Sequence, residues 1–140
     1  MNKENHKKLA LEDLLARAEQ RAVDKKAYKQ VYFPTLGGDL VFEKIPLTRM
    51  LAMVDGVDGE NLMDSLAFQV DLIYQCCPML RNRALQEAYD CKEPTDIVCR
   101  VFDDYFGDIS KAAEAILDFY GLGEDQNKVK NSSGATRTLP

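Results

Sequence analysis

The sequence predicts a predominantly helical α+β fold, in which a small N-terminal β-hairpin packs with about five helices ahead of a disordered C-terminal tail. Apolar residues recur at the spacing of amphipathic helices through most of the 140 residues. One stretch rich in strand formers surrounds the pair Gly37-Gly38 and predicts the hairpin. After residue 123 apolar residues almost cease, which predicts disorder.

Charge and periodicity set the first 30 residues apart. They carry eight Lys or Arg against five Asp or Glu, and residues 9–26 have the pattern of an amphipathic helix. The apolar side of this helix consists of Leu11, Leu14, Leu15, Ala18 and Ala22. We therefore expect residues 1–30 to be a basic helical extension, residues 31–123 a single domain and residues 124–140 a disordered tail.

The hairpin is predicted from strand formers at residues 31–33 and 40–42. Residues 34–39 between them read Pro-Thr-Leu-Gly-Gly-Asp, and glycine adopts positive φ without steric cost, as tight turns require. Phe33, Val41 and Ile45 are expected to supply one apolar face.

Two helices are predicted next, separated by a loop at residues 55–59. Pro46 suits the first turn of a short helix over residues 46–54. A second helix covers residues 60–77 and ends where Pro78 would clash with a further helical turn. The side chains expected inside are Met50, Leu51 and Val54 of the first helix, and Leu62, Met63, Leu66, Val70, Ile73, Tyr74 and Cys77 of the second.

Three further helices complete the predicted domain. A short one, over about residues 81–90, should bury Leu85, Ala88 and Tyr89. Pro94 is placed to open the next, with Asp96 near its positive end. The apolar side of that helix is expected to be Ile97, Val98, Val101, Phe102 and Tyr105. The last helix, residues 109–120, has Asp108 as its predicted N-cap, and Gly121 and Gly123 as its stop signals. Its inner face is expected to be Ile109, Ala112, Ala113, Ile116, Leu117 and Tyr120.

The charge balance argues against nucleic acid as a partner. Residues 31–123 carry seven Lys or Arg against sixteen Asp or Glu, whereas binding to phosphates needs clustered Lys and Arg. Apolar runs are far shorter than the roughly 18 residues that span a bilayer, and the polar start MNKENHKK leads into no signal-type segment. We expect a cytoplasmic protein that binds neither nucleic acid nor membrane.

Catalytic and metal-binding constellations are lacking in the sequence. The single histidine, His6, lies in a polar terminus, and no phosphate-binding glycine motif is present. A calcium loop starting at Asp55 would need oxygen ligands at positions 57 and 59 and glycine at 60, but the chain has Val57, Gly59 and Glu60. We therefore expect no enzyme activity, no cofactor and no metal.

The four cysteines do not have the spacing of a zinc or redox site. Cys76 and Cys77 are adjacent, and Cys91 and Cys99 lie eight residues apart within helical patterns. Disulfides are possible in principle, but reduced thiols in a reducing compartment fit the pattern better.

The order of these elements resembles the tail-assembly chaperone family of tailed phages, in the form found in contractile-tailed phages and defective prophages of Gram-positive hosts. The resemblance covers roughly residues 31–122. It includes the segment IPLTRMLAM and is clearest in PMLRNRALQEAYDCKEPTDIVCRVF and the helix before Gly121. Its motifs are helix boundaries and apolar positions.

The resemblance implies a non-enzymatic role in virion assembly. Members of the family bind the tape-measure protein, keep it soluble, help to recruit tail-tube subunits and are absent from the mature particle. Many are made in two lengths by a translational frameshift, so the resemblance leaves open a longer form of this protein. A homo-oligomer is a separate expectation that also stays open. The alternative is a generic acidic helical adaptor or regulatory protein-binding module.

The candidate partner-binding residues lie in the C-terminal helices. Tyr105 and Phe119 are the expected anchors, because large aromatic side chains carry disproportionate interface energy. Asp103, Asp104 and Asp118 are expected to steer a basic helical partner toward a groove. The alternative is that Tyr105 and Phe119 belong to the core.

Overall fold

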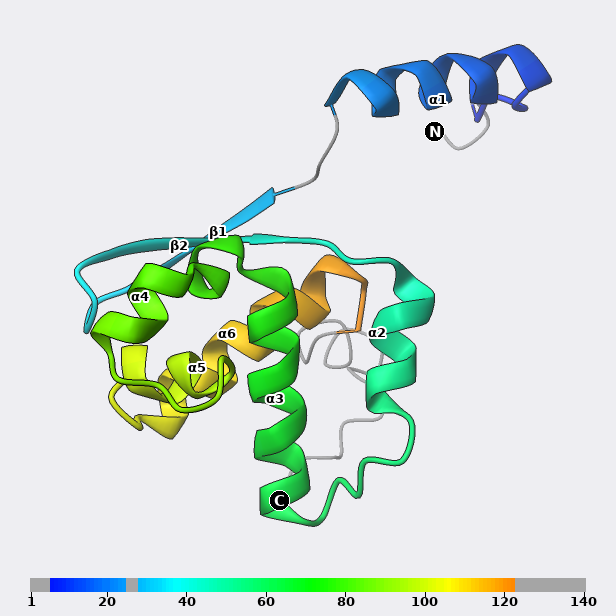
Figure 1. Cartoon of the computed structure of the whole chain (residues 1–140). Helices are drawn as coiled ribbons and strands as arrows, with labels where there is room; N and C mark the ends of the chain where they lie inside the picture. The colour runs from blue at the N-terminus through cyan, green and yellow to red at the C-terminus, as the bar shows by residue number, and fades with distance from the viewer. Residues whose placement is uncertain (1–5, 25–27, 123–140) are drawn as a thin grey trace.

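Helices dominate the structure, a computed structural model that describes residues 6–24 and 28–122 (Figure 1). The elements are α1 (Leu11–Asp24), β1 (Tyr28–Phe33), β2 (Gly38–Glu43), α2 (Leu47–Val54), α3 (Leu62–Cys76), the 3-10 helix η2 (Pro78–Arg81), α4 (Arg83–Ala88), α5 (Asp96–Val101) and α6 (Phe106–Phe119). The predicted fold class is confirmed: a two-stranded antiparallel hairpin lies along one side of the body formed by α2 to α6, and α1 lies apart from them in Figure 1. The predicted tail, residues 124–140, lies outside the described residues.

The hairpin presents one apolar face to the helices. Its register pairs Val31 with Leu40, and side chains alternate between the two faces of a strand. Val31, Phe33, Leu40 and Phe42 therefore share the buried face. The prediction that Val41 faces inward is wrong, because the register places Val41 on the opposite face, where it is only half-buried.

The turn of the hairpin follows the predicted chemistry. Gly37 has a φ of 73°, and the N–H groups of Leu36 and Gly37 both donate to the carbonyl of Phe33 at 2.9 Å. The strands extend beyond the predicted residues 31–33 and 40–42, because Tyr28 pairs with Glu43 at the open end.

Part of the predicted interior of α2 and α3 is exposed. Met50 is buried and Met53 packs against the core, but Leu51 and Val54 are exposed, contrary to prediction. An eight-residue helix turns only one side to its neighbour, and the other apolar side faces outward. In α3 the residues fully buried are Leu72, Ile73 and Cys76, while Leu62 and Met63 in its first turn are 75% and 71% exposed.

Arg81 closes the end of α3. Its guanidinium donates to the carbonyl of Tyr74 at 3.0 Å and to that of Gln75 at 2.6 Å. These carbonyls lie in the last turn of α3, where no further helical N–H can reach them. Pro78 begins η2, as expected of a residue that stops α3. The helix α4 partly buries Leu85, but the prediction that Ala88 and Tyr89 are buried is wrong, since both lie on its exposed side.

The last two helices begin at other residues than predicted. α5 starts at Asp96, whose carboxylate accepts hydrogen bonds from the backbone N–H groups of Lys92 and Glu93. α6 starts at Phe106, so Asp108 is not its N-cap. Asp108 is instead buried in the first turn, where it accepts a hydrogen bond from the Thr35 hydroxyl at 2.5 Å.

The end of α6 has the predicted glycine stop. Gly121 has a φ of 77°, and the N–H of Leu122 donates to the carbonyl of Leu117 at 2.9 Å. Gly123, the second predicted stop, lies outside the described residues. On the inner face Ile109, Ala112, Ala113 and Ile116 are buried as predicted, and Leu117 and Tyr120 pack against them.

Phe102, directly after α5, and Lys111 of α6 hold the hairpin against the helical core. The ring of Phe33 meets that of Phe102 with centroids 5.0 Å apart. Lys111 lies 4.9 Å from the centroid of the Phe33 ring and donates to the carbonyl of Tyr32 at 2.6 Å. Among the described helices, none combines the length and apolar character needed to cross a bilayer.

Candidate interaction surface

The structure places the five predicted partner-binding residues in two separate groups. Asp103, Asp104 and Tyr105 lie in the connection before α6, whereas Asp118 and Phe119 lie in its last turn. A helix of 14 residues is about 20 Å long, at 1.5 Å per residue. The two groups therefore belong to opposite ends of α6 and do not form one compact site.

The first group forms an exposed acidic and aromatic turn. Asp103 and Asp104 both have positive φ angles, 57° and 60°, and the N–H of Asp104 donates to the carbonyl of Cys99 at 2.8 Å. Tyr105 is 57% exposed, so it does not belong to the core, and the neighbouring Phe106 is 46% exposed. Phe106 was not among the predicted residues, although it directly follows three consecutive candidates in the sequence.

Phe119 and Asp118, the second group, are more sheltered. The Phe119 ring is half-buried beneath the ammonium of Lys44, which lies 5.4 Å from its centroid, and its centroid is 6.5 Å from that of Tyr120. Oδ1 of Asp118 is buried, and no hydrogen-bond donor reaches it from the described residues. Lys44 and Tyr120 thus hold Phe119 in place without burying it in the core.

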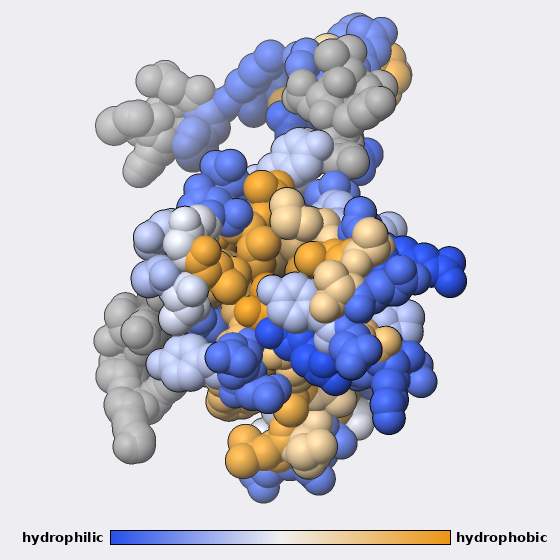
Figure 2. Space-filling model, turned by 60° about the vertical axis from the view of Figure 1, so that its left-hand side comes forward, coloured by the Kyte–Doolittle hydropathy of each residue, from blue (hydrophilic) through white to orange (hydrophobic). Residues whose placement is uncertain are grey.

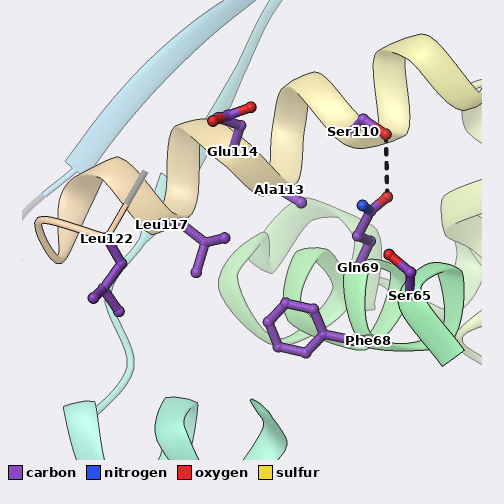
Figure 3. Close-up of a pocket in the computed structure, with 8 residues that line it drawn as sticks. All are labelled: Ser65, Phe68, Gln69, Ser110, Ala113, Glu114, Leu117 and Leu122. Carbon is purple, nitrogen blue, oxygen red and sulfur yellow. Dashed lines mark hydrogen bonds between the residues drawn. The ribbon is translucent and has the colours of Figure 1, made fainter. Parts of the chain in front are cut away.

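An open groove of about 320 Å³ lies between α3 and α6 (Figure 3). In the close-up, Phe68 on α3 faces Leu117 and Leu122 across the gap, and the Ser110 hydroxyl lies 3.3 Å from Oε1 of Gln69 at the far end. The residues that line the groove are Ser65, Phe68, Gln69, Ser110, Ala113, Glu114, Leu117 and Leu122. The groove thus has an apolar end and a polar end.

An acidic side chain accompanies the apolar end of this groove. Glu114 of α6 is the carboxylate among its lining residues. Leu122 is 44% exposed at its margin. These features suit the apolar side of a helix that also carries basic residues.

A second groove lies on another part of the body. It measures about 760 Å³ and is formed by η2 and α4, with Pro78, Met79, Ala84, Leu85 and Ala88 as its apolar lining and Arg81 and Asn82 beside them. Figure 2 looks onto the side that carries the hairpin and α4, and it shows apolar residues gathered at the centre of the body. This groove is more open, and no carboxylate lines it.

The cysteines have structural positions. Cys76 and Cys77 are buried in the core, and all four thiols are free. Burial raises the pKa of Cys76 to about 11 and also raises the pKa of Cys77, so both thiols are protonated and weakly nucleophilic near neutral pH. Within residues 6–24 and 28–122, no three His, Cys, Asp or Glu side chains are grouped closely enough to hold a metal ion.

The fold and its surface define a mainly helical α+β protein with open apolar grooves. Comparison of the chain with protein-family models, with curated proteins and with solved structures found no match.

Proposed function

We propose that this protein is a tail-assembly chaperone that binds a tape-measure protein and helps to recruit tail-tube subunits. The observation that carries the proposal is the groove between α3 and α6, which is lined by the half-buried Phe68 and Leu117, the exposed Leu122 and the carboxylate of Glu114. The identity of the proposed partner rests on the sequence resemblance over residues 31–122.

The groove offers what an amphipathic helix needs. Such a helix projects apolar anchors at i, i+3, i+4 and i+7, and a groove between two helices accepts them. A tape-measure protein is long and largely helical, so its apolar sides self-associate unless another protein covers them. Phe68 and Leu117 would contact the anchors, while Glu114 would lie beside basic flanking residues of the partner.

The exposed turn before α6 extends this surface. Tyr105 and Phe106 offer two aromatic side chains, and Asp103 and Asp104 offer the charges that steer a basic partner. Phe119, at the other end of α6, serves as the second predicted anchor. It lies about 200° round α6 from Leu117, beside Lys44, so a partner that contacts Phe119 must reach beyond the groove.

A chaperone must release its partner when the tail tube polymerises around it. Open grooves on a solvent-exposed face suit a micromolar affinity, which corresponds to about 8 kcal/mol. In this proposal the protein acts without a cofactor or catalysis in the bacterial cytoplasm, and it is absent from the mature particle. A longer frameshifted form would share residues 31–122.

Co-expression with a tape-measure protein tests the proposal. Leu122→Glu places a charge at the margin of the α3–α6 groove, and Met79→Glu is the matched control in the η2–α4 groove, since Met79 is 60% exposed. We expect the wild type and Met79→Glu to keep the tape-measure protein soluble and to co-purify with it, and Leu122→Glu to fail. Equal thermal unfolding temperatures would show that both variants fold.

A wild-type protein that neither solubilises nor co-purifies with the tape-measure protein would overturn the proposal. Capture of another helical protein through the same groove would instead favour a generic adaptor. Loss of binding in Met79→Glu alone would move the site to the η2–α4 groove.

A further inference from the structure

The groove between η2 and α4 differs in charge from the groove between α3 and α6. Arg81 is among the residues that line the η2–α4 groove, and no carboxylate from the described part of the chain lines it. The α3–α6 groove shows the opposite arrangement. Glu114 lines it, and no Lys or Arg of the described residues does. The two grooves therefore suit partners of different charge.

Apolar side chains from two short elements form the η2–α4 groove. At about 100° per residue, Ala84, Leu85 and Ala88 lie on one side of α4. They line the groove together with Pro78 and Met79 of η2. The Met79 side chain is 60% exposed, and methionine adapts its shape to many apolar surfaces. An open hollow of about 760 Å³ has room for several apolar side chains of another protein.

Two guanidinium groups meet at Gln75, in the last turn of α3. Nη1 of Arg81 donates to the carbonyl of Gln75 at 2.6 Å, and Nη2 of Arg49 donates to the side-chain Oε1 of the same residue. Neither guanidinium forms an ion pair with a carboxylate of the described residues. Two positive charges this close repel each other, and a carboxylate placed beside both would relieve that repulsion.

Positive charge continues on the other side of α4. A smaller hollow there, of about 440 Å³, is lined by Arg81, Arg83 and Lys92 against one carboxylate of the described residues, that of Glu87. Arg83 and Glu87 are ion-paired at 3.6 Å, so their charges offset each other and those of Arg81 and Lys92 remain. Across residues 31–123 the balance is reversed, since seven Lys or Arg stand against sixteen Asp or Glu. The surroundings of α4 thus favour an acidic partner within an acidic domain.

We propose that the η2–α4 groove binds a helix of another protein whose apolar side chains are flanked by Asp or Glu. The apolar anchors of this helix contact Met79, Leu85 and Ala88, and its carboxylates lie beside Arg81 and Arg49. This inference goes beyond the tape-measure function, because it concerns a different surface and a partner of the opposite charge.

Fluorescence anisotropy with two synthetic helical peptides tests the proposal. Both peptides carry leucines at i, i+3, i+4 and i+7, and their other side holds glutamate in one peptide and glutamine in the other. We expect the full chain to bind the glutamate peptide more tightly. Because the formal net charge of the chain is −5, this preference would report the local positive charge at the groove.

A variant of the groove itself provides the second readout. Met79→Glu should bind the glutamate peptide about ten-fold more weakly or worse, because the new carboxylate would lie against the apolar side of the peptide. Leu122→Glu, which alters the α3–α6 groove, is the matched control and should bind it as the wild type does. Thermal unfolding checks that both variants are folded.

A charge reversal beside the groove tests the electrostatic part. Arg49→Glu is chosen because Arg81 itself closes the end of α3, and it should weaken binding of the glutamate peptide several-fold. Arg17→Glu makes the same change of charge on α1, which lies apart from the body in Figure 1, and should have no effect. Wild-type binding should also weaken as salt is added.

Three results would each overturn the proposal. The first is a wild type that binds the glutamine peptide as tightly as the glutamate peptide, or binds neither. The second is a Met79→Glu variant that binds the glutamate peptide as the wild type does. The third is a wild-type dimer in analytical ultracentrifugation that Met79→Glu dissociates, because a second copy of the chain would then occupy the groove. Tape-measure binding is tested separately, through Leu122→Glu.

Discussion

The hydroxyl of Tyr120 makes two hydrogen bonds to the backbone of Ile45, accepting from its N–H at 2.7 Å and donating to its carbonyl at 2.6 Å. These bonds join the end of α6 to the segment between β2 and α2. The Tyr120 hydroxyl is thus the hydrogen-bond partner of both the N–H and the carbonyl of Ile45, which belongs to no strand or helix.

Replacing Tyr120 with Phe should destabilise the fold by about 1–3 kcal/mol, because it leaves both backbone groups of Ile45 without their partner. Chemical denaturation measures this change in the free energy of unfolding. Tyr32→Phe is the control, since the Tyr32 ring is 54% exposed and should lose less than about 0.5 kcal/mol. Equal losses in the two variants would contradict the structural role of Tyr120.

The hydrogen bond between Thr35 and Asp108 should show a measurable coupling energy. Thr35→Val and Asp108→Ala each remove one partner of the contact between the hairpin turn and α6. In a double-mutant cycle, we expect their destabilisations to be non-additive by about 1–3 kcal/mol, since the partners are in direct contact. Strictly additive changes would show that the two side chains do not interact in solution.

Asp103 and Asp104, which both have a positive φ before α6, allow effects on stability and effects on partner binding to be measured separately. Asp103→Gly and Asp104→Gly should each stabilise the protein by up to about 1–2 kcal/mol, because glycine adopts a positive φ without the clash of Cβ. Asp103→Asn and Asp104→Asn should leave stability nearly unchanged, since asparagine tolerates this conformation. Both pairs of variants should slow association with the tape-measure protein and reduce its salt dependence, as measured by stopped-flow.

The two predicted aromatic anchors should differ in their effects on stability. Tyr105→Ala should change stability by less than about 0.5 kcal/mol, because the ring is 57% exposed, and should weaken partner binding. Phe119→Ala should cost about 1–2 kcal/mol, since it removes a half-buried ring that packs with Lys44 and Tyr120. A Tyr105→Ala variant that unfolds at much lower temperature would return Tyr105 to a structural role.

Stability should fall in alkaline solution because of Cys76. Burial raises the pKa of this thiol from 9.0 to about 11, so between these pH values the unfolded chain releases the proton before the folded chain does. The folded state then loses up to about 2–3 kcal/mol relative to the unfolded state. Denaturation curves for wild type and Cys76→Ala should therefore converge above pH 9. A constant difference between them would contradict this assignment.

The order of the helices and most of their inward sides could be predicted, because helical periodicity is a local property of the sequence. The choice of face in β2 could not be predicted. It depends on the pairing of Val31 with Leu40, and a shift of one residue would bring Val41 inside. The start of α6 was also predicted wrongly. Asp108 was the predicted N-cap, but its carboxylate accepts a hydrogen bond from Thr35, which is 73 residues away in the hairpin turn.

Periodicity also cannot tell which apolar stripes find a neighbour within the chain. Leu51, Val54, Leu62 and Met63 fit the predicted patterns, yet all four are exposed. The α3–α6 groove was beyond prediction for a related reason. Phe68 and Leu117 come from distant parts of the sequence, and only the packing of α3 on α6 brings their side chains face to face.

The hydrogen bonds between residues in or near the hairpin and residues in or near α6 affect how the chain folds while it is being synthesised. Thr35 with Asp108, Ile45 with Tyr120 and Tyr32 with Lys111 are separated by 73, 75 and 79 residues. At about 5–20 residues per second, a ribosome takes roughly 4–16 seconds to translate such an interval. For that time β1, which carries Phe33, has no α6 to pack against, so the nascent hairpin must wait for almost the whole domain to emerge before the face of β1 is closed.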